Sequence, residues 1–161
     1  MSKGSMLDLT LVIVLALVIG LVSIFGYMVW SEFVDAMPSD IRYDEVNQTI
    51  DNVTTVLSGF DYLFVFLISG LCFAVIIGAF MVKSHPIFFI FVWFILGIEI
   101  LLSVMISNVF SDIITESVIV GYASQFTYTV MFIQNLPVFI LGMGAVIALV
   151  MFSKGDKGGP V

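Results

Sequence analysis

Four long apolar runs restrict what this chain can fold into more than any other feature. They cover residues 9–30, 62–82, 87–106 and 128–152, and a helix needs about 20 apolar residues to cross a bilayer. Of the 161 residues, 61% are apolar and 11% are charged, which leaves too few polar side chains to cover a soluble domain. We therefore predict an all-α integral membrane protein, a multi-pass four-helix transmembrane bundle that forms one domain over residues 9–152.

The first connecting segment, residues 31–61, is acidic but has a helical pattern. Four apolar residues recur in it at helical spacing: Val46, Ile50, Val53 and Leu57. Pro38 and Ser39 are typical of a helix start, and Ser58 and Gly59 of a helix end, which predicts a separate amphipathic helix before the second span. Because this helix lacks the Lys/Arg face of a lipid-binding helix, we expect it to pack on protein.

The remaining segments are short or weakly patterned. Residues 83–86 read KSHP, and so short a turn predicts that the second and third spans form an antiparallel hairpin. Residues 107–127 form a second polar segment with a weak apolar face at Phe110, Ile113 and Ile114. Residues 1–8 are expected to form an N-terminal tail, and the Gly- and Lys-rich residues 153–161 a disordered C-terminal tail.

The basic residues predict an orientation. Four of the five fall on one side of a four-span bundle: Lys3, Lys83, Lys154 and Lys157. The positive-inside rule then places both termini inside and Arg42 outside. Nine of the twelve acidic residues also lie outside: Glu32, Asp35, Asp40, Asp44, Glu45, Asp51, Asp61, Asp112 and Glu116. Two glycosylation sequons, at Asn47 and Asn52, fall on the same side, and the first run is too long for a signal-peptide core, so we expect an uncleaved first span.

Small residues predict how the spans pack. In lipid, helices associate through close backbone approach rather than through apolar burial. Small residues recur every four positions in the second span, and pairs occur in the first and fourth: Gly70, Ala74, Gly78, Ala16, Gly20, Gly144 and Ala148. We favour packing within the bundle for these residues, and the alternative is a surface for self-association or for a partner.

One carboxylate interrupts the third run, in the stretch FILGIEILLSV. Glu99 lies about 18 Å from the inner end of that span, near the bilayer centre, where a charge is costly. No Lys or Arg lies at that depth, so the expected polar partners are Gln134, Asn135, Ser103 and a backbone carbonyl freed by Pro137. We favour a neutral Glu99 hydrogen-bonded across the third and fourth spans; contact with a partner's cation and proton or ion handling are the alternatives.

Composition and motifs argue against several classes of function. The formal net charge of −7 disfavours nucleic-acid binding and a polybasic lipid clamp. Cys72 and His85 are the single cysteine and histidine, so we expect no disulfide, metal cluster or haem cofactor. Catalytic motifs and an EF-hand spacing are missing from the sequence, so we expect neither an enzyme nor a metal site.

These features predict a structural or assembly subunit of a larger membrane-embedded assembly, such as a membrane protein complex or the membrane of a virion. The acidic outer segments would be the docking surface for other membrane subunits or for further copies of the chain. The alternative is an oligomeric pore, holin-like or a small ion channel, that uses Glu99. A small transporter is third, since the two halves show no clear repeat beyond each having an outer segment.

Overall fold

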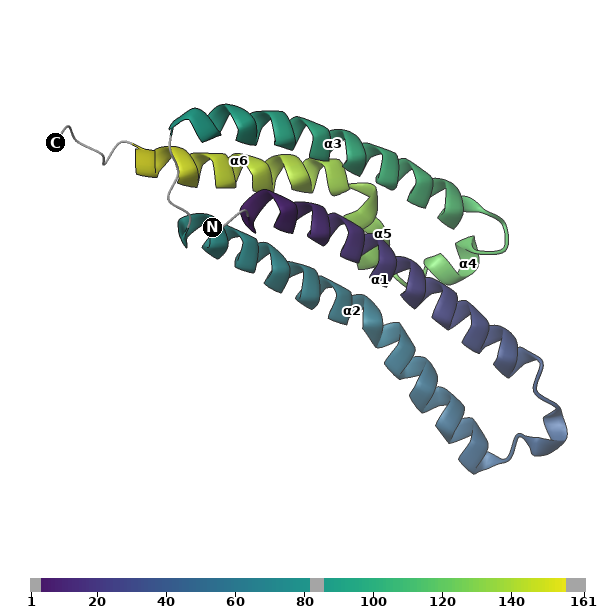
Figure 1. Cartoon of the computed structure of the whole chain (residues 1–161). Helices are drawn as coiled ribbons and strands as arrows, with labels where there is room; N and C mark the ends of the chain where they lie inside the picture. The colour runs from purple at the N-terminus through teal and green to yellow at the C-terminus, as the bar shows by residue number, and fades with distance from the viewer. Residues whose placement is uncertain (1–3, 82–85, 156–161) are drawn as a thin grey trace.

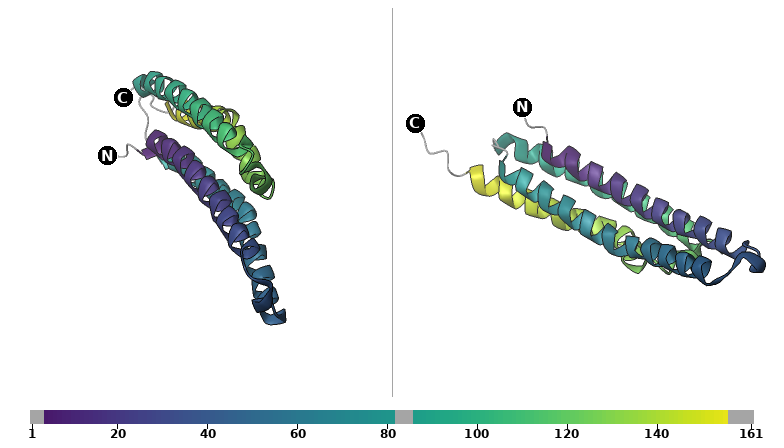
Figure 2. Two further views of the ribbon diagram at one scale, coloured as in Figure 1. Left: turned by 90° about the vertical axis from the view of Figure 1, so that its right-hand side faces the viewer. Right: turned by 90° about the horizontal axis from the view of Figure 1, so that it is seen from below.

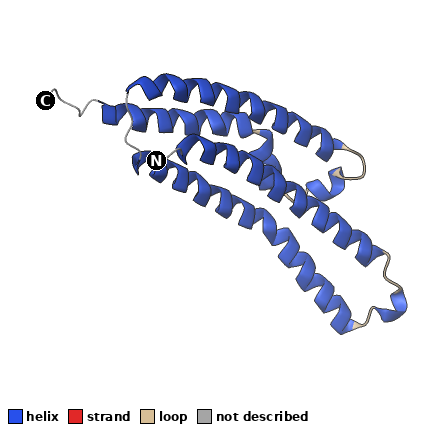
Figure 3. Cartoon of the chain, viewed as in Figure 1, coloured by secondary structure: helices blue, strands red, loops and turns tan. Residues whose placement is uncertain are grey.

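The computed structural model describes residues 4–81 and 86–155, with the side chains of residues 10–80, 90–151 and 153. These residues form helices and the turns that join them (Figures 1 and 3). The long helices are α1 (Gly4–Asp35), α2 (Asp44–Met81), α3 (Pro86–Thr115) and α6 (Leu136–Gly155). Short elements join them: the 3-10 turn η1 (Ser39–Ile41), α4 (Val120–Ala123) and α5 (Thr127–Gln134).

The helices support the multi-pass prediction made from the apolar runs. Three of them are long and apolar enough to cross a membrane, and a fourth span exists if α5 and α6 count together. That last span is broken, because the axes of α5 and α6 differ by 66°. The orientation of the ends remains a prediction, and the KSHP turn, apart from Pro86, lies with His85 outside the described residues.

Several helices are longer than the apolar runs that predicted them. The largest difference is in α2, which runs without a break through Ser58 and Gly59 for 38 residues, about 57 Å at 1.5 Å per residue. A glycine inside a helix costs only about 1 kcal/mol, and here the Trp30 indole donates a 3.0 Å hydrogen bond to Thr54 on this stretch. The predicted amphipathic helix is therefore the first part of α2, and its four apolar residues are half-buried.

Three other helices also extend beyond the spans that the sequence predicts. α1 begins at Gly4 and extends to Asp35, so most of the predicted N-terminal tail is helical. α3 continues nine residues beyond 106 to Thr115, with Phe110 and Ile114 buried on its inner face. α6 continues to Gly155, into the tail that was expected to be disordered.

The helices associate as two pairs. α1 packs mainly on α2, and α3 packs mainly on α6, while α5 contacts α1, α2 and α3 (Figures 1 and 2). α2 packs on α1, α5 and α6 rather than on α3, so the expected hairpin of the second and third spans does not form. The four residues between Met81 and Pro86 can reach about 17 Å when extended, which is long enough to join helices that are not neighbours.

Small residues set the closest approaches. A Cβ built on Gly144 would overlap Leu96 Cδ1 of α3, and one on Gly20 would lie 2.5 Å from Ile133 Cδ1 of α5. Ala16 and Ala148 are buried in the core as well. The series in α2 differs: Gly70 and Ala74 are exposed, and a Cβ on Gly70 or Gly78 would meet nothing within 4 Å, so this face packs on no other helix of the described chain.

The buried face of α3 shows how the core is divided. Its apolar residues near the start of the helix belong to one cluster and those near its end to a second: Val92 and Leu96, then Phe110 and Ile114. Three polar residues occupy the same buried face between these apolar residues: Glu99, Ser103 and Ser107. Along the buried face of α3, a polar layer therefore lies between two apolar stretches.

The break in the last span lies at this polar layer. Pro137 has no N–H to donate to the preceding turn, which interrupts the helix. The Val138 N–H donates to Asn135 O, three residues back, at 3.0 Å instead of to Gln134 O. The Gln134 carbonyl, which would accept the Val138 N–H in a continuous helix, receives the Ser107 hydroxyl of α3 at 2.7 Å.

Candidate functional site

Glu99 projects from α3 into the centre of the bundle. It is 1% exposed, and its Oε1 accepts a 2.8 Å hydrogen bond from the Thr10 hydroxyl of α1. Its Oε2 is buried, and no donor for it occurs among the described residues. One oxygen of this carboxyl is therefore held by α1, while the other is buried without a partner among the described residues.

The expected partners of Glu99 lie elsewhere. The side chains of Gln134 and Asn135 are exposed, and the Asn135 amide donates to Met131 O at 2.8 Å, within its own helix. Ser103 is buried one turn after Glu99 on α3, but its hydroxyl donates to Ile100 O at 2.8 Å. The bond from Glu99 thus joins the first and third spans, whereas the third and fourth spans are joined by Ser107.

A second carboxyl, Asp61, is also buried, with 4% exposure. Its two oxygens accept the backbone N–H groups of Tyr128 and Thr129, at 3.0 and 2.7 Å. These are free N–H groups in the first turn of α5, whose own N-cap, Phe126, provides no side-chain hydrogen bond. Asp61 of α2 therefore caps α5 from another helix, where the helix dipole also favours a negative charge.

Sequence reasoning did not identify the role of Asp61. The residue was assigned to the outer acids because it precedes the second apolar run. A signal was nevertheless present: α5 has no acidic residue in its first turn and no Ser, Thr, Asp or Asn at its N-cap. A helix without a local cap needs one from elsewhere, and Asp61 is an isolated acid between two apolar stretches, as Glu99 is.

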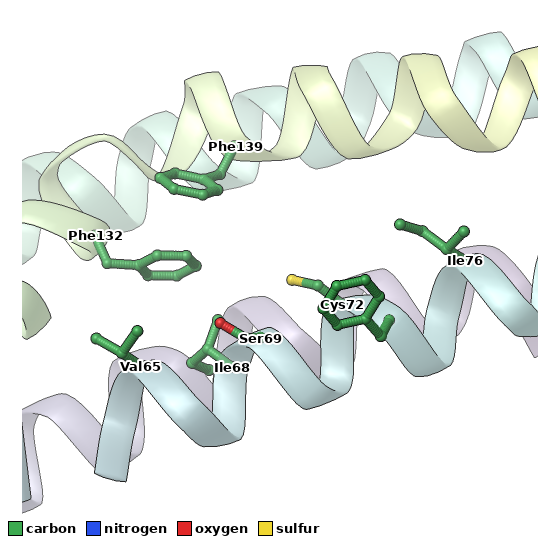
Figure 4. A pocket seen from close by; sticks show the side chains of 8 residues that line it. Val65, Ile68, Ser69, Cys72, Ile76, Phe132 and Phe139 are labelled. Carbon is green, nitrogen blue, oxygen red and sulfur yellow. The ribbon is translucent and has the colours of Figure 1, made fainter. Parts of the chain in front are cut away.

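An apolar cavity of about 240 Å³ opens between α2 and the break of the last span. Figure 4 shows Ser69 and Cys72 on the α2 wall and the rings of Phe132 and Phe139 on the other. The centroids of the two rings lie 4.5 Å apart, on either side of the break. The cavity therefore lies at the bend between α5 and α6, both of which pack on α2.

The α1–α2 hairpin projects beyond the rest of the bundle at the end where α1 joins α2, which we call the hairpin end (Figure 1). From the level of the Thr10–Glu99 bond, α1 continues for 25 residues and α3 for 16, a difference of about 14 Å. Four large apolar side chains on this projection are strongly exposed: Val29 (65%), Phe33 (56%), Tyr43 (61%) and Val56 (63%).

The projection is tied to the bundle by α4. The Tyr122 hydroxyl donates a 2.6 Å hydrogen bond to Glu32 Oε1. This bond, assisted by slight burial and by the charges of Glu32 and Asp35, raises the pKa of Tyr122 above its ordinary value. Within the projection, the Arg42 guanidinium donates to Val34 O and so closes the loop between α1 and α2.

No group of three or more His, Cys, Asp or Glu side chains suited to a metal ion occurs within the described part of the chain. The outer acids of residues 32–51 lie along the exposed surface of the projection rather than around one point. The chemistry that the interior provides is therefore that of two buried carboxyls, Glu99 and Asp61.

Comparison with known proteins gives no family for this chain. No protein-family model matches it, and neither the curated proteins nor the solved structures contain a significant match.

Proposed function

We propose that this chain is a non-catalytic structural subunit of a larger membrane-embedded protein assembly, and that it meets its partners at the hairpin end. The observation that supports this proposal most directly is the exposed apolar surface of the projection, formed by Val29, Phe33, Tyr43 and Val56. Large apolar surfaces that are left uncovered mark interaction sites in soluble surroundings. Farther from the hairpin end, exposed apolar side chains on the spans are explained by lipid.

The charges of the projection indicate the kind of partner. Six acids lie on it or beside it: Glu32, Asp35, Asp40, Asp44, Glu45 and Asp51. Arg42 is the one basic residue between positions 31 and 61. A partner that covers this surface would combine apolar side chains with basic ones, because complementary charges favour association and orient it.

The proposal includes the membrane orientation that the lysines predict, with four spans, both termini inside and the hairpin end outside. Single cysteines in a Cys72→Ser background test it. Asp35→Cys should react with a membrane-impermeant maleimide in intact cells, and Ser2→Cys only after the membrane is permeabilised. Labelling of Ser2→Cys in intact cells would reject this orientation.

The test of function is the composition of the native particle. The protein, extracted from its own membrane in mild detergent, should co-purify in fixed stoichiometry with at least one other protein. The double variant Phe33→Ser/Tyr43→Ser should release the partner. Gln48→Ser, at an exposed polar position of the same projection, is the matched control and should retain it.

A discrete particle that contains this chain alone would contradict the proposal and favour a pore between copies. Such a pore needs a polar surface facing outward, and Glu99 instead faces the interior. Conductance that depends on Glu99 in a purified homo-oligomer would establish the pore in spite of this geometry.

A further inference from the structure

The carboxyl of Glu99 is buried with only half of its hydrogen-bonding capacity used. Oε1 accepts the Thr10 hydroxyl at 2.8 Å, and Oε2 has no donor among the described residues. Buried polar atoms in proteins almost always have a partner, so an exception indicates a function or a ligand. The side chain is 1% exposed, which excludes bulk water as the partner of Oε2.

Among the described side chains, no Lys or Arg lies near this carboxyl, since Arg42 is at the hairpin end. Lys and Arg are missing from the sequence between residues 4 and 41, between 43 and 82, and between 84 and 153. Along α1, the titratable group nearest to Thr10 is Asp8, whose side chain lies outside the described residues, and along α3 the one nearest to Glu99 is Asp112, 13 residues away. α2 carries the half-buried Cys72 and, nearer the hairpin end, Asp61. α6 has none between Leu136 and Ser153. The described side chains therefore leave the charge of Glu99 to be balanced by a mobile cation.

The available oxygens favour a proton over a metal ion. Oxygen-liganded metal ions take about six ligands. The nearest hydroxyls on the two helices are already committed, since Thr10 donates to Glu99 itself and Ser103 donates to Ile100 O. A proton needs a single oxygen, and Oε2 is free to take it.

We propose that Glu99 is an intramembrane proton-binding site, in which the proton occupies Oε2 and the Thr10 hydroxyl holds Oε1. The site goes beyond the proposed subunit function and does not depend on it. When the proton is bound, the carboxyl is neutral and α1 and α3 are joined through an apolar interior. When the proton leaves, an unpaired charge remains between two apolar clusters, which is strongly unfavourable.

Infrared spectroscopy of the purified full chain in lipid vesicles tests this directly, because it needs no reagent to reach the buried site. The difference spectrum of wild type minus Glu99→Gln at neutral pH should show the C=O stretch of a protonated carboxylic acid. The control difference, wild type minus Asp61→Asn, should show carboxylate bands only, since Asp61 accepts two N–H groups. Carboxylate bands alone for Glu99 would overturn the proposal.

Three further measurements locate the proton, test whether it exchanges and identify the ion. Thr10→Val should move the Glu99 band to higher frequency, because Oε1 loses its hydrogen bond; an unmoved band would overturn the assigned geometry. Raising the pH should convert the band reversibly to carboxylate, and a band that persists until the protein unfolds would overturn a binding role. Loss of the band on adding sodium, but not choline, at fixed pH would show a metal-ion site instead.

Discussion

The bundle contains two buried carboxyls, Asp61 and Glu99, which differ in the number of hydrogen bonds that their oxygens accept. Asp61 has a backbone N–H on each oxygen and the positive end of α5 in front of it. Among the described residues, Glu99 has one hydroxyl donor, to Oε1, and none to Oε2. Both oxygens of Asp61 accept a hydrogen bond, so this carboxylate joins α5 to α2. In Glu99, Oε2 is the oxygen on which we propose that a proton binds.

The largest expected effect comes from removing the satisfied carboxyl. Asp61→Ala leaves two N–H groups in the first turn of α5 without an acceptor and should lower the free energy of unfolding by about 2–4 kcal/mol. Asp61→Asn retains one acceptor oxygen and should lose about half as much. Thermal unfolding of the purified protein in one detergent measures both. Equal stability of Asp61→Ala and wild type would show that this cap contributes nothing.

The packing around the same joint should be nearly as sensitive. Gly20 lies against Ile133 and against Thr129, whose N–H Asp61 accepts. Gly20→Ala forces these side chains apart and should cost about 1–3 kcal/mol. Gly70→Ala is the matched control, because its Cβ meets nothing within 4 Å, and it should leave the unfolding temperature unchanged or slightly higher. If both variants behave alike, the close approach of α1 and α5 is not a constraint.

Around Glu99, the expected loss of stability is smaller. Thr10→Val keeps the shape of the side chain but removes the one donor to Glu99, and should lower the free energy of unfolding by about 1 kcal/mol. Thr10→Ser retains the hydroxyl and serves as the control. If Thr10→Val lowered the free energy of unfolding as much as Asp61→Ala, the two carboxyls would contribute equally to stability.

Glu99→Gln should change stability least among the interior variants. The amide reproduces a neutral carboxyl, accepts from Thr10 in the same way and carries no charge. The unfolding temperature of Glu99→Gln should match that of wild type. The unfolding temperature of Glu99→Leu should be lower, because the Thr10 hydroxyl is left unpaired. A marked loss in Glu99→Gln alone would mean that the folded bundle requires the anion.

Tyr122 adds a weak pH dependence at the hairpin end. Its pKa in the folded protein is raised above the ordinary value of 10.0, mainly by the hydrogen bond to Glu32. The stabilisation from this bond is complete below that value and is lost as the pH rises through the folded pKa. Unfolding curves between pH 8 and 11, with Tyr122→Phe as the control, should show a small decline in wild type that the variant lacks.

The sequence predicts the helices and the buried position of Glu99, since both follow from apolar run length and from the cost of charge in lipid. It does not predict Thr10 as the partner, because that depends on the relative height of α1 and α3. This height is set by the packing of α1 against α2 and α3, which no run length encodes. The uninterrupted α2 was missed for a related reason: Ser58 and Gly59 end many helices, but here tertiary contacts outweigh their local preference.

The length of α2 has a mechanical consequence. The helix is a single stiff rod of about 57 Å, and it continues for 17 residues from Asp61, where it is joined to α5, to Asp44 at the hairpin end. These residues span about 26 Å, so a tilt of about 10° around Asp61 would displace the far tip by about 4 Å. Small rearrangements around Asp61 would therefore be transmitted along the helix to the hairpin end.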